Sequence, residues 1–347
     1  MNSLRSGLPR RLRLGRVLAP AIVIAALAVG GLSRVAVANG VTIWGSNAPT
    51  CTATTPTPSG TPSAFPDASN TGVPAGTALK ASPLAFPDAS NTGVPAGTTH
   101  KASRSAFPDA SNTGVPAGTA LKASDGTLTL STNGQVVSGL DITGNVLITA
   151  SNVTLQRSRI TGGNWNIIQI SGSATNVTIQ DVEINGTGSV EGANGILGTA
   201  TVLRTNIYGI ENGIVPLSNS VIRDNYIHGL KAPGSPHYDG IQIDGGQNNV
   251  RITHNHIDMH EWNQTATVMI DNYFGAISNI AVDNNLLVGG GYTVYSDGRF
   301  NSSVISGVSF TNNRIGKGYW GFASINGPRA VWTGNVDATS GTAIAQP

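Results

Sequence analysis

Three aspartates each end a short segment in which apolar and other side chains alternate, and such carboxylates could do acid–base or metal chemistry. The segments read Ile-Gln-Ile-Asp, Val-Met-Ile-Asp and Val-Tyr-Ser-Asp, and they end in Asp244, Asp271 and Asp297. Alternation with a period of two is typical of β-strands, and it places the three carboxylates on one outer face. On neighbouring strands, two such charges would repel by about 3–4 kcal/mol at an effective dielectric constant of about 20. The column therefore needs a shared proton, a bound cation or a nearby base such as Arg299.

Two kinds of chemistry fit this column. Calcium binds carboxylate oxygens, so calcium is the expected cofactor, with Asp244, Asp271 and Asp297 as its ligands. Asp271 is also a candidate catalytic acid or base, because carboxyl groups about 5–5.5 Å apart are typical of retaining glycosidases. The alternative is three solvated aspartates at strand ends, since Asp is common in turns.

A second candidate pair lies just before the first of these segments, in the stretch Ser-Pro-His-Tyr-Asp-Gly-Ile. Here His237 stands two residues before Asp239. A histidine beside a carboxylate can act as a general base, so both are candidate catalytic residues. Arg299 or Lys231 would balance the carboxylates of an acidic substrate or abstract a proton.

Aromatic residues gather in the same part of the chain. Aromatic rings offer flat faces against which sugar rings stack. The candidate substrate-binding residues are Lys231, Tyr238, Trp262, Tyr292 and Tyr295. The alternative is that these rings are loop residues that cover the fold. A zinc site at His254, His256 and His260 is also considered, although their spacing matches no known zinc motif.

A degenerate repeat must position these residues. Apolar pairs such as Val177/Ile179 and Val250/Ile252 alternate with other residues, and equivalent positions return every 18 to 30 residues from residue 125 onward. Such short intervals leave no room for crossover helices, but they suit parallel strands that stack coil upon coil at about 4.8 Å. We therefore expect an all-β solenoid, with a β-sandwich as the alternative.

One position of the repeat is asparagine in four successive coils, at Asn225, Asn255, Asn285 and Asn313. Stacked amides can hydrogen-bond along the column and to the backbone of a bend, which predicts a buried polar ladder. A β-sandwich would not place asparagine in one slot of consecutive repeats. We assign these residues a structural role.

The coils that carry the candidate residues are the longest. The intervals are 30, 30 and 28 residues between Asn225 and Asn313, and 18 to 24 residues elsewhere. Insertions in a solenoid gather on one face and commonly build its binding surface. We therefore expect a groove on the coils of residues 225–313.

The charged residues are few and unevenly spread. Only 11% of the 347 residues are charged, and six of the 20 cations are arginines in the first 38 residues, which contain no acid. The remainder has 14 cations and 18 acids, a balance that argues against a nucleic-acid partner. A single cysteine excludes a disulfide scaffold.

The N-terminal region has the pattern of an export signal. Residues 1–38 combine arginines, an apolar stretch and a final Ala-Val-Ala, which predicts a signal peptide. No later segment approaches membrane length, so we expect a secreted protein with no membrane partner in its mature form. Its oligomeric state, monomer or otherwise, stays open.

Residues 39–105 are predicted to be a disordered linker rich in Thr, Pro and Ser. The sequence Ala-Phe-Pro-Asp-Ala-Ser-Asn-Thr-Gly-Val-Pro-Ala-Gly-Thr begins at Ala64 and recurs unchanged 21 and 42 residues later. Each copy has too few apolar residues to fold alone. Because solenoids need capped ends, we expect the third copy, 106–124, to cover the N-terminal end of the 125–347 domain through Phe107.

These features resemble a known family. The strand pattern resembles the right-handed parallel β-helix proteins of the pectate-lyase-like superfamily, and the repeated segment is similar to one that precedes the first coil in secreted bacterial β-helix repeat proteins. The resemblance implies a right-handed parallel β-helix of about nine coils. Ser-Pro-His-Tyr-Asp-Gly-Ile resembles the Ser-Pro-Asn-Thr-Asp-Gly-Ile of polygalacturonases, whose aspartate is catalytic, which implies an acid or base role for Asp239. Their Asn-Thr is replaced here by His-Tyr, and their Gly-His-Gly and Arg-Ile-Lys motifs are missing.

The expected function is action on an extracellular or cell-wall polysaccharide, by lyase or glycoside hydrolase chemistry in the groove of the long coils. One alternative is a carbohydrate-binding surface protein without catalysis. The other is a purely structural solenoid.

Overall fold

The computed structural model describes residues 36–38, 41–43 and 106–347. The predicted linker and the first two repeat copies lie outside these residues, as does almost all of the predicted signal peptide. Two short strands, β1 (Ala36–Ala38) and β2 (Val41–Ile43), pair antiparallel. Every other strand belongs to one of three parallel sheets. Among the described residues, no helix has the length and hydropathy of a membrane span.

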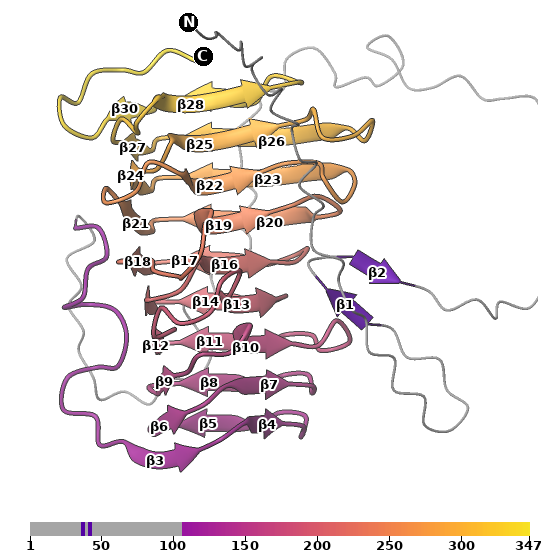
Figure 1. Cartoon of the computed structure of the whole chain (residues 1–347), viewed down its shortest axis with the longest axis vertical. Coiled ribbons are helices and arrows are strands. Elements are labelled where there is room, and N and C mark those ends of the chain that lie inside the picture. The colour runs from indigo at the N-terminus through magenta and orange to yellow at the C-terminus, as the bar shows by residue number, and fades with distance from the viewer. Residues whose placement is uncertain (1–35, 39–40, 44–105) are drawn as a thin grey trace, which may run out of the picture.

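The first sheet, here the groove sheet, has nine strands stacked in coil order (Figure 1). They are β4 (Leu128–Leu130), β7 (Val146–Ile148), β10 (Asn166–Ile170), β13 (Asn194–Gly198), β16 (Asn212–Pro216), β19 (Tyr238–Ile243), β22 (Thr265–Ile270), β25 (Tyr292–Asp297) and β28 (Gly321–Asn326).

The second sheet, here the middle sheet, also has nine strands. They are β5 (Val136–Ser138), β8 (Thr154–Gln156), β11 (Thr178–Gln180), β14 (Thr201–Leu203), β17 (Val221–Arg223), β20 (Asn248–Thr253), β23 (Ile277–Asp283), β26 (Ile305–Thr311) and β29 (Val331–Thr333).

The third sheet, here the strap sheet, has ten strands. They are β3 (Lys122–Asp125), β6 (Leu140–Thr143), β9 (Arg159–Thr161), β12 (Glu183–Asn185), β15 (Asn206–Tyr208), β18 (Tyr226–His228), β21 (His256–Met259), β24 (Leu286–Gly289), β27 (Arg314–Ile315) and β30 (Val336–Asp337). Each coil passes from the groove sheet through the middle sheet to the strap sheet. The chain is thus a right-handed parallel β-helix, as predicted, and the β-sandwich alternative is excluded.

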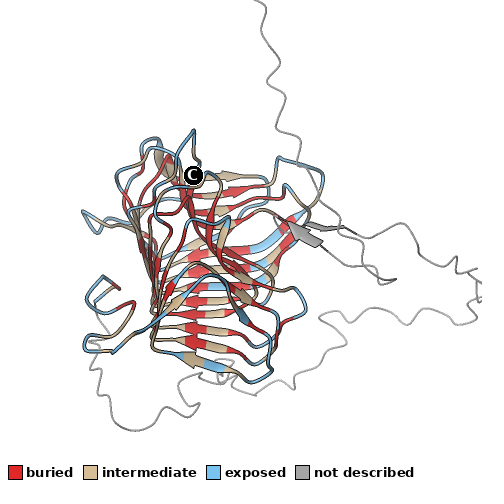
Figure 2. Ribbon diagram, turned by 60° about the horizontal axis from the view of Figure 1, so that its bottom comes forward, coloured by how far each residue is buried: buried red, intermediate tan, exposed pale blue. Residues whose placement is uncertain are grey.

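The core is a set of aliphatic columns inside the coil. Ile214 pairs with Ile241, and Ile241 pairs with Val268, so alternate positions of successive strands stack directly. All three are at most 1% exposed. Figure 2 shows the buried residues aligned from strand to strand along the stack. Side chains alternate between the inside and the outside of the coil along each strand. Because successive strands are in register, the inward side chains form columns in the core and the outward side chains form columns on the surface.

The asparagine ladder is confirmed. Asn255 Nδ2 donates to Asn285 Oδ1 at 3.0 Å, and Asn285 Nδ2 donates to Asn313 Oδ1 at 2.9 Å. The same amide oxygens accept from the backbone of the preceding coil, since Asn255 N donates to Asn285 Oδ1 at 2.8 Å. Asn313 extends the ladder to Asn335.

The ladder secures a bend with a left-handed backbone. The residue before the ladder position has φ between 45 and 60° at Arg157, Asp181, Arg204, Asp224, His254, Asn284 and Asn312. A non-glycine residue costs about 1–2 kcal/mol in this conformation. The buried hydrogen bonds of the ladder offset that cost and hold the bend between the middle and strap sheets.

The third repeat copy lies on the side of the stack, where its residues 106–121 form a segment that we call the strap (Figure 1). The ring of Phe107 stacks on His254 with a centroid distance of 5.3 Å. His254 belongs to a central coil, so the expectation that Phe107 covers the N-terminal end is corrected. Only β3, which pairs with β6, lies at that end. Nothing in the repeat's own composition indicated which wall it would contact.

The C-terminal residues fold back onto the last coil. Trp332 Nε1 donates to Ile344 O at 2.7 Å, and Ile344 N donates to Asn335 O at 3.0 Å. An antiparallel bridge joins Val336 to Ala343. The last turn of the solenoid is therefore covered by the chain itself.

Candidate functional site

The structure places the three aspartates in one column on the outer face of the groove sheet. Asp271 and Asp297 form a parallel bridge, and Asp297 pairs with Asn326 on the next coil. Asp271 N donates to Ile243 O at 2.9 Å, which puts Asp244 one coil below Asp271. Neighbouring rungs of a parallel sheet are about 4.8 Å apart, so the three residues stand on adjacent rungs. Asp271 and Asp297 are 4% and 6% exposed, and Asp244 is only partly buried.

The environments of the three carboxyl groups differ. Burial raises the pKa of Asp244 to about 7, and the charge of Asp271 adds to the effect. Burial also raises the pKa of Asp271 to about 6, partly opposed by a hydrogen bond from Tyr273 N at 2.8 Å. One column thus holds two carboxyl groups that exchange protons near neutral pH.

Asp297 behaves in the opposite way because Arg299 binds it. Arg299 Nε and Nη2 donate to its two carboxylate oxygens at 3.0 and 2.7 Å. Burial alone would raise the pKa of Asp297, but the hydrogen bonds from Arg299 outweigh burial and lower it. Arg299 is therefore the counter-ion of Asp297, and Asp297 stays ionised.

Asp239 ends a second column on the same sheet, made of asparagines. Asn194 Nδ2 donates to Asn166 Oδ1 at 2.8 Å, and Asn212 Nδ2 donates to Asn194 Oδ1 at 3.1 Å. Asp239 is the next member, since it pairs with Asn212 in register. Asn212 Oδ1 is buried and lacks a donor. The next residue of the stack is thus an acid that could supply a donor if it carried a proton.

The surroundings of Asp239 favour that proton. Its side chain is only 3% exposed, and one oxygen accepts a hydrogen bond from Ala266 N at 3.2 Å. Burial raises the pKa of Asp239 well above its usual range, and the charges of Asp244, Asp271 and Glu211 add to this. Asp239 is therefore a largely enclosed acid that holds its proton more strongly than a solvated aspartate.

Glu211 also belongs to the site, although no sequence pattern marks it. It is 7% exposed, and its carboxylate accepts from His237 N at 3.0 Å and from Gly192 N. It thus holds the loop that carries His237. Its position directly before Asn212 in a short coil shows no alternation or spacing that marks a functional acid.

A hollow of about 280 Å³ opens on the groove sheet below the aspartate column. It is lined by Trp165, Gly192, Asn194, Glu211, Asn212, Val215, His237, Gln242 and Asp244. Only His237, Gln242 and Asp244 come from the long coils, so the groove extends further toward the N-terminal coils than predicted. Asp244 belongs both to the lining of the hollow and to the aspartate column.

The aromatic predictions are corrected in part. Tyr238 is only 4% exposed, and its ring stacks on Trp262 at 4.3 Å. Trp262 Nε1 donates to Leu230 O at 2.9 Å, and Trp262 lines a smaller hollow with Tyr226 and Asp258. Tyr238 therefore packs the loop of the long coil and offers no free face to a sugar, and Trp262 lies outside the groove.

Other rings do lie along the groove sheet. Tyr292 contacts Tyr295 and Trp320 with centroid distances of 5.6 and 6.0 Å. Trp320, just before β28, is 54% exposed, and Trp165, which lines the hollow, is 53% exposed. The two tryptophans lie in coils without insertions, so the interval pattern does not single them out.

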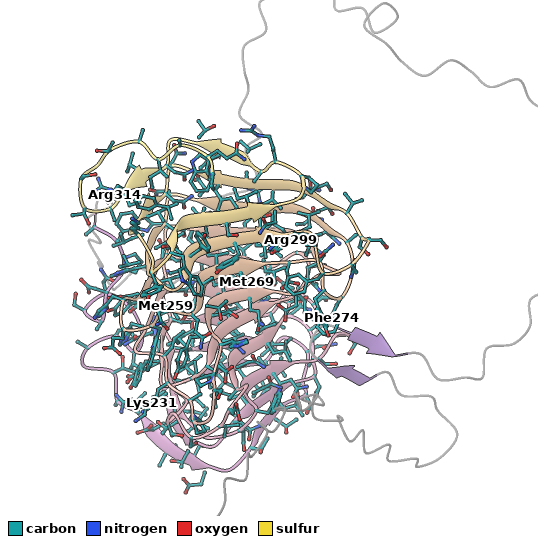
Figure 3. All side chains as sticks on the ribbon, turned by 45° about the horizontal axis from the view of Figure 1, so that its top comes forward. Lys231, Met259, Met269, Phe274, Arg299 and Arg314 are labelled. Atoms are coloured by element: carbon teal, nitrogen blue, oxygen red, sulfur yellow. The ribbon has the colours of Figure 1, made fainter. Side chains whose placement is uncertain are left out.

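The remaining predicted residues are dispersed. Met269 lies in the middle of the sheet in Figure 3, with Arg299 above it and Lys231 at the lower left. Lys231 is exposed, and its side chain passes close to Gly188. The structure therefore does not bring Lys231 to the aspartate column.

The arrangement does not form a cage for a metal ion. Among residues 106–347, no group of three His, Cys, Asp or Glu side chains converges as metal ligands would. Asp297 is occupied by Arg299, so calcium ligation by this column does not fit the side chains as they stand. His254, His256 and His260 bind Asp224, Pro108 O and Asp258 respectively, which removes the zinc suggestion.

Comparison with known proteins gives no further guide to this site. No protein-family model, curated protein or solved structure matches the chain.

Proposed function

We propose that this protein is a secreted glycoside hydrolase that cleaves an extracellular or cell-wall polysaccharide on the outer face of the groove sheet. The observation that carries the proposal is the pair Asp244 and Asp271, stacked one coil apart beside the hollow, with pKa values raised to about 7 and about 6. Two carboxyl groups whose environments separate their pKa values are what acid–base cleavage of a glycosidic bond requires.

The roles follow from protonation and position. Asp244 keeps its proton to higher pH and lines the hollow, so it protonates the oxygen of the leaving sugar. Asp271 ionises first and acts as the nucleophile or base on the adjacent coil. A rung spacing of about 4.8 Å is close to the separation of about 5–5.5 Å found in retaining enzymes.

Hydrolysis fits these residues better than a lyase reaction. A lyase must abstract a proton next to a uronate carboxylate, and a cation must stabilise the resulting charge. Arg299, the nearby base, is held by both oxygens of Asp297. The β-helix and the polygalacturonase-like stretch around Asp239 support a place in the pectate-lyase-like superfamily, and the N-terminal pattern supports secretion.

The test is incubation of the full chain with a panel of neutral and uronic-acid polysaccharides, with and without a chelator. We expect new reducing ends, no unsaturated products and no effect of the chelator. Asp244→Asn and Asp271→Asn should abolish the products. Asp258→Asn, in the strap sheet, is the matched control and should retain them. Unsaturated products would instead establish a lyase.

A second candidate is a carbohydrate-binding protein without catalysis. The more than half-exposed rings of Trp165, beside β10, and Trp320, beside β28, favour it, because they could hold a glycan chain at two points. Retention of a polysaccharide without new ends, lost in Trp165→Ala and Trp320→Ala, would support this function.

A further inference from the structure

The strap docks on the solenoid through specific contacts. Phe107 stacks on His254, and the buried Pro108 accepts a hydrogen bond at its carbonyl oxygen from His256 Nδ1 at 2.9 Å. Further along, Gly114 N donates to Arg204 O at 2.8 Å. His254 and Arg204 belong to different coils, so the strap crosses successive turns of one wall.

The strap fits this wall closely. Gly114 has a φ of 74°, and a Cβ there would lie 3.0 Å from Asn206 Cβ. Thr113 is 8% exposed, and its hydroxyl donates to Asp109 O at 2.6 Å. The strap then runs into β3, which pairs with β6 in register. Strap and end strand together form one docking unit of residues 106–124.

The same unit occurs elsewhere in the chain. Residues 64–82 are identical to residues 106–124 at all 19 positions, including the Lys-Ala-Ser of β3. The counterparts of Phe107 are Phe65 and Phe86, which stand 42 and 21 residues earlier. Every side chain that makes the docking contacts is therefore present in the first copy.

We propose that the wall formed by His254, His256 and Arg204 is a peptide-binding site that accepts residues 64–82 of the same chain in place of residues 106–124. The two segments carry the same contact residues, so the choice between them depends on the entropy of the loop that is left out. That entropy cost grows only slowly with loop length. Exchange of the strap would change the length of chain that precedes the docked segment.

The test compares one substitution in two backgrounds. In a chain that already carries Phe65→Ala and Phe86→Ala, Phe107→Ala should lower the thermal unfolding midpoint by about 2–4 °C. In the otherwise unchanged chain, Phe107→Ala should lower it by less than half as much, because another copy replaces the strap. Equal falls in the two backgrounds would overturn the proposal.

Two controls separate the alternatives. His254→Ala removes the receptor ring and should lower the midpoint equally in both backgrounds. Phe65 and Phe86 should reduce the fall in the unfolding midpoint by the same amount at every protein concentration. If the reduction grows with concentration, the replacing segment comes from a second molecule, and the proposal of exchange within one chain is wrong. A labelled peptide of residues 64–82 should bind the triple Phe→Ala variant, and its own Phe→Ala version should not. Absence of binding by the unaltered peptide would also overturn the proposal.

Discussion

Asp239 pairs in register with Asn212, whose buried Oδ1 has no hydrogen-bond donor. The pair joins the fold to the site, because an asparagine column of the short coils ends in an acid of the first long coil. A proton on Asp239 would continue the column. Asp239 and Asp271 are 3% and 4% exposed, so Asp244 is the carboxyl group of this face that is most open to a substrate.

The effect of replacing Asp239 on stability should therefore depend on whether the new side chain keeps its hydrogen-bonding groups in place. Asp239→Asn keeps a donor for Asn212 Oδ1 and an acceptor for Ala266 N, so the free energy of unfolding should stay within about 0.5 kcal/mol of wild type. Asp239→Ala leaves both groups unpaired and should cost about 1–3 kcal/mol. Urea unfolding measures both variants. An Asn variant as unstable as the Ala variant would show that the carboxyl is ionised.

The stability of the fold should fall as pH rises from about 4 to about 7. The pKa values of Asp244 and Asp271 are raised to about 7 and about 6, so the folded state binds more protons than the unfolded state in this range. Their stabilising contribution is fully present below the unfolded pKa and is lost as pH rises through the folded values. Urea unfolding across this range measures the slope. The double variant Asp244→Asn/Asp271→Asn should reduce the slope and leave the part that comes from Asp239, whose pKa is also raised by burial. An unchanged slope would contradict the assignment.

Removal of Arg299 should destabilise the protein at neutral pH and not in acid. The pKa of Asp297 is lowered because hydrogen bonds from Arg299 outweigh burial, so its contribution is present above the unfolded pKa and lost as pH falls. Arg299→Gln should lower the unfolding midpoint at pH 7 and leave it nearly unchanged below pH 3. Arg314→Gln, an exposed arginine of the strap sheet, is the control and should show no such pH dependence.

The asparagine ladder should contribute measurably to the free energy of unfolding. Asn255→Leu leaves Asn225 N without its partner and removes one of the two hydrogen bonds of Asn225 Nδ2, which should cost about 1–3 kcal/mol of unfolding free energy. The exposed Asn263 serves as the control, where Leu should change stability by less than about 0.5 kcal/mol. Equal losses of unfolding free energy at the two positions would mean that the buried hydrogen bonds of the ladder do not stabilise the fold.

The coil and its columns could be predicted because each rests on a local rule. Ile241 and Ile243 alternate with Gln242 and Asp244, and this alternation alone assigns the inner and outer faces. The return of Asn255, Asn285 and Asn313 at one slot fixes which residues stack. The stacking of Asp271 on Asp297 agrees with the strand alternation, but the asparagine slot does not give it, because the two residues stand 14 and 16 positions before Asn285 and Asn313.

The positions of the aromatic rings, of Glu211 and of the strap depend on contacts between distant parts of the chain, which no local sequence pattern encodes. Tyr238 and Trp262 look like exposed loop rings in the sequence, but they stack on each other because the long loop folds onto its own coil. Glu211 and Trp165 enter the groove from coils without insertions. The strap contacts His254 rather than the end of the stack, because its wall is defined only once the coils have assembled.

The backward turn of the C-terminal residues over the last coil has a consequence for assembly. A stack of parallel strands ends in a row of unsatisfied amide and carbonyl groups, which is a template for another molecule. Here Trp332, Ile344 and the bridge from Val336 to Ala343 cover the part of that edge formed by β29 and β30. The tail thereby removes part of the template that a second molecule could extend.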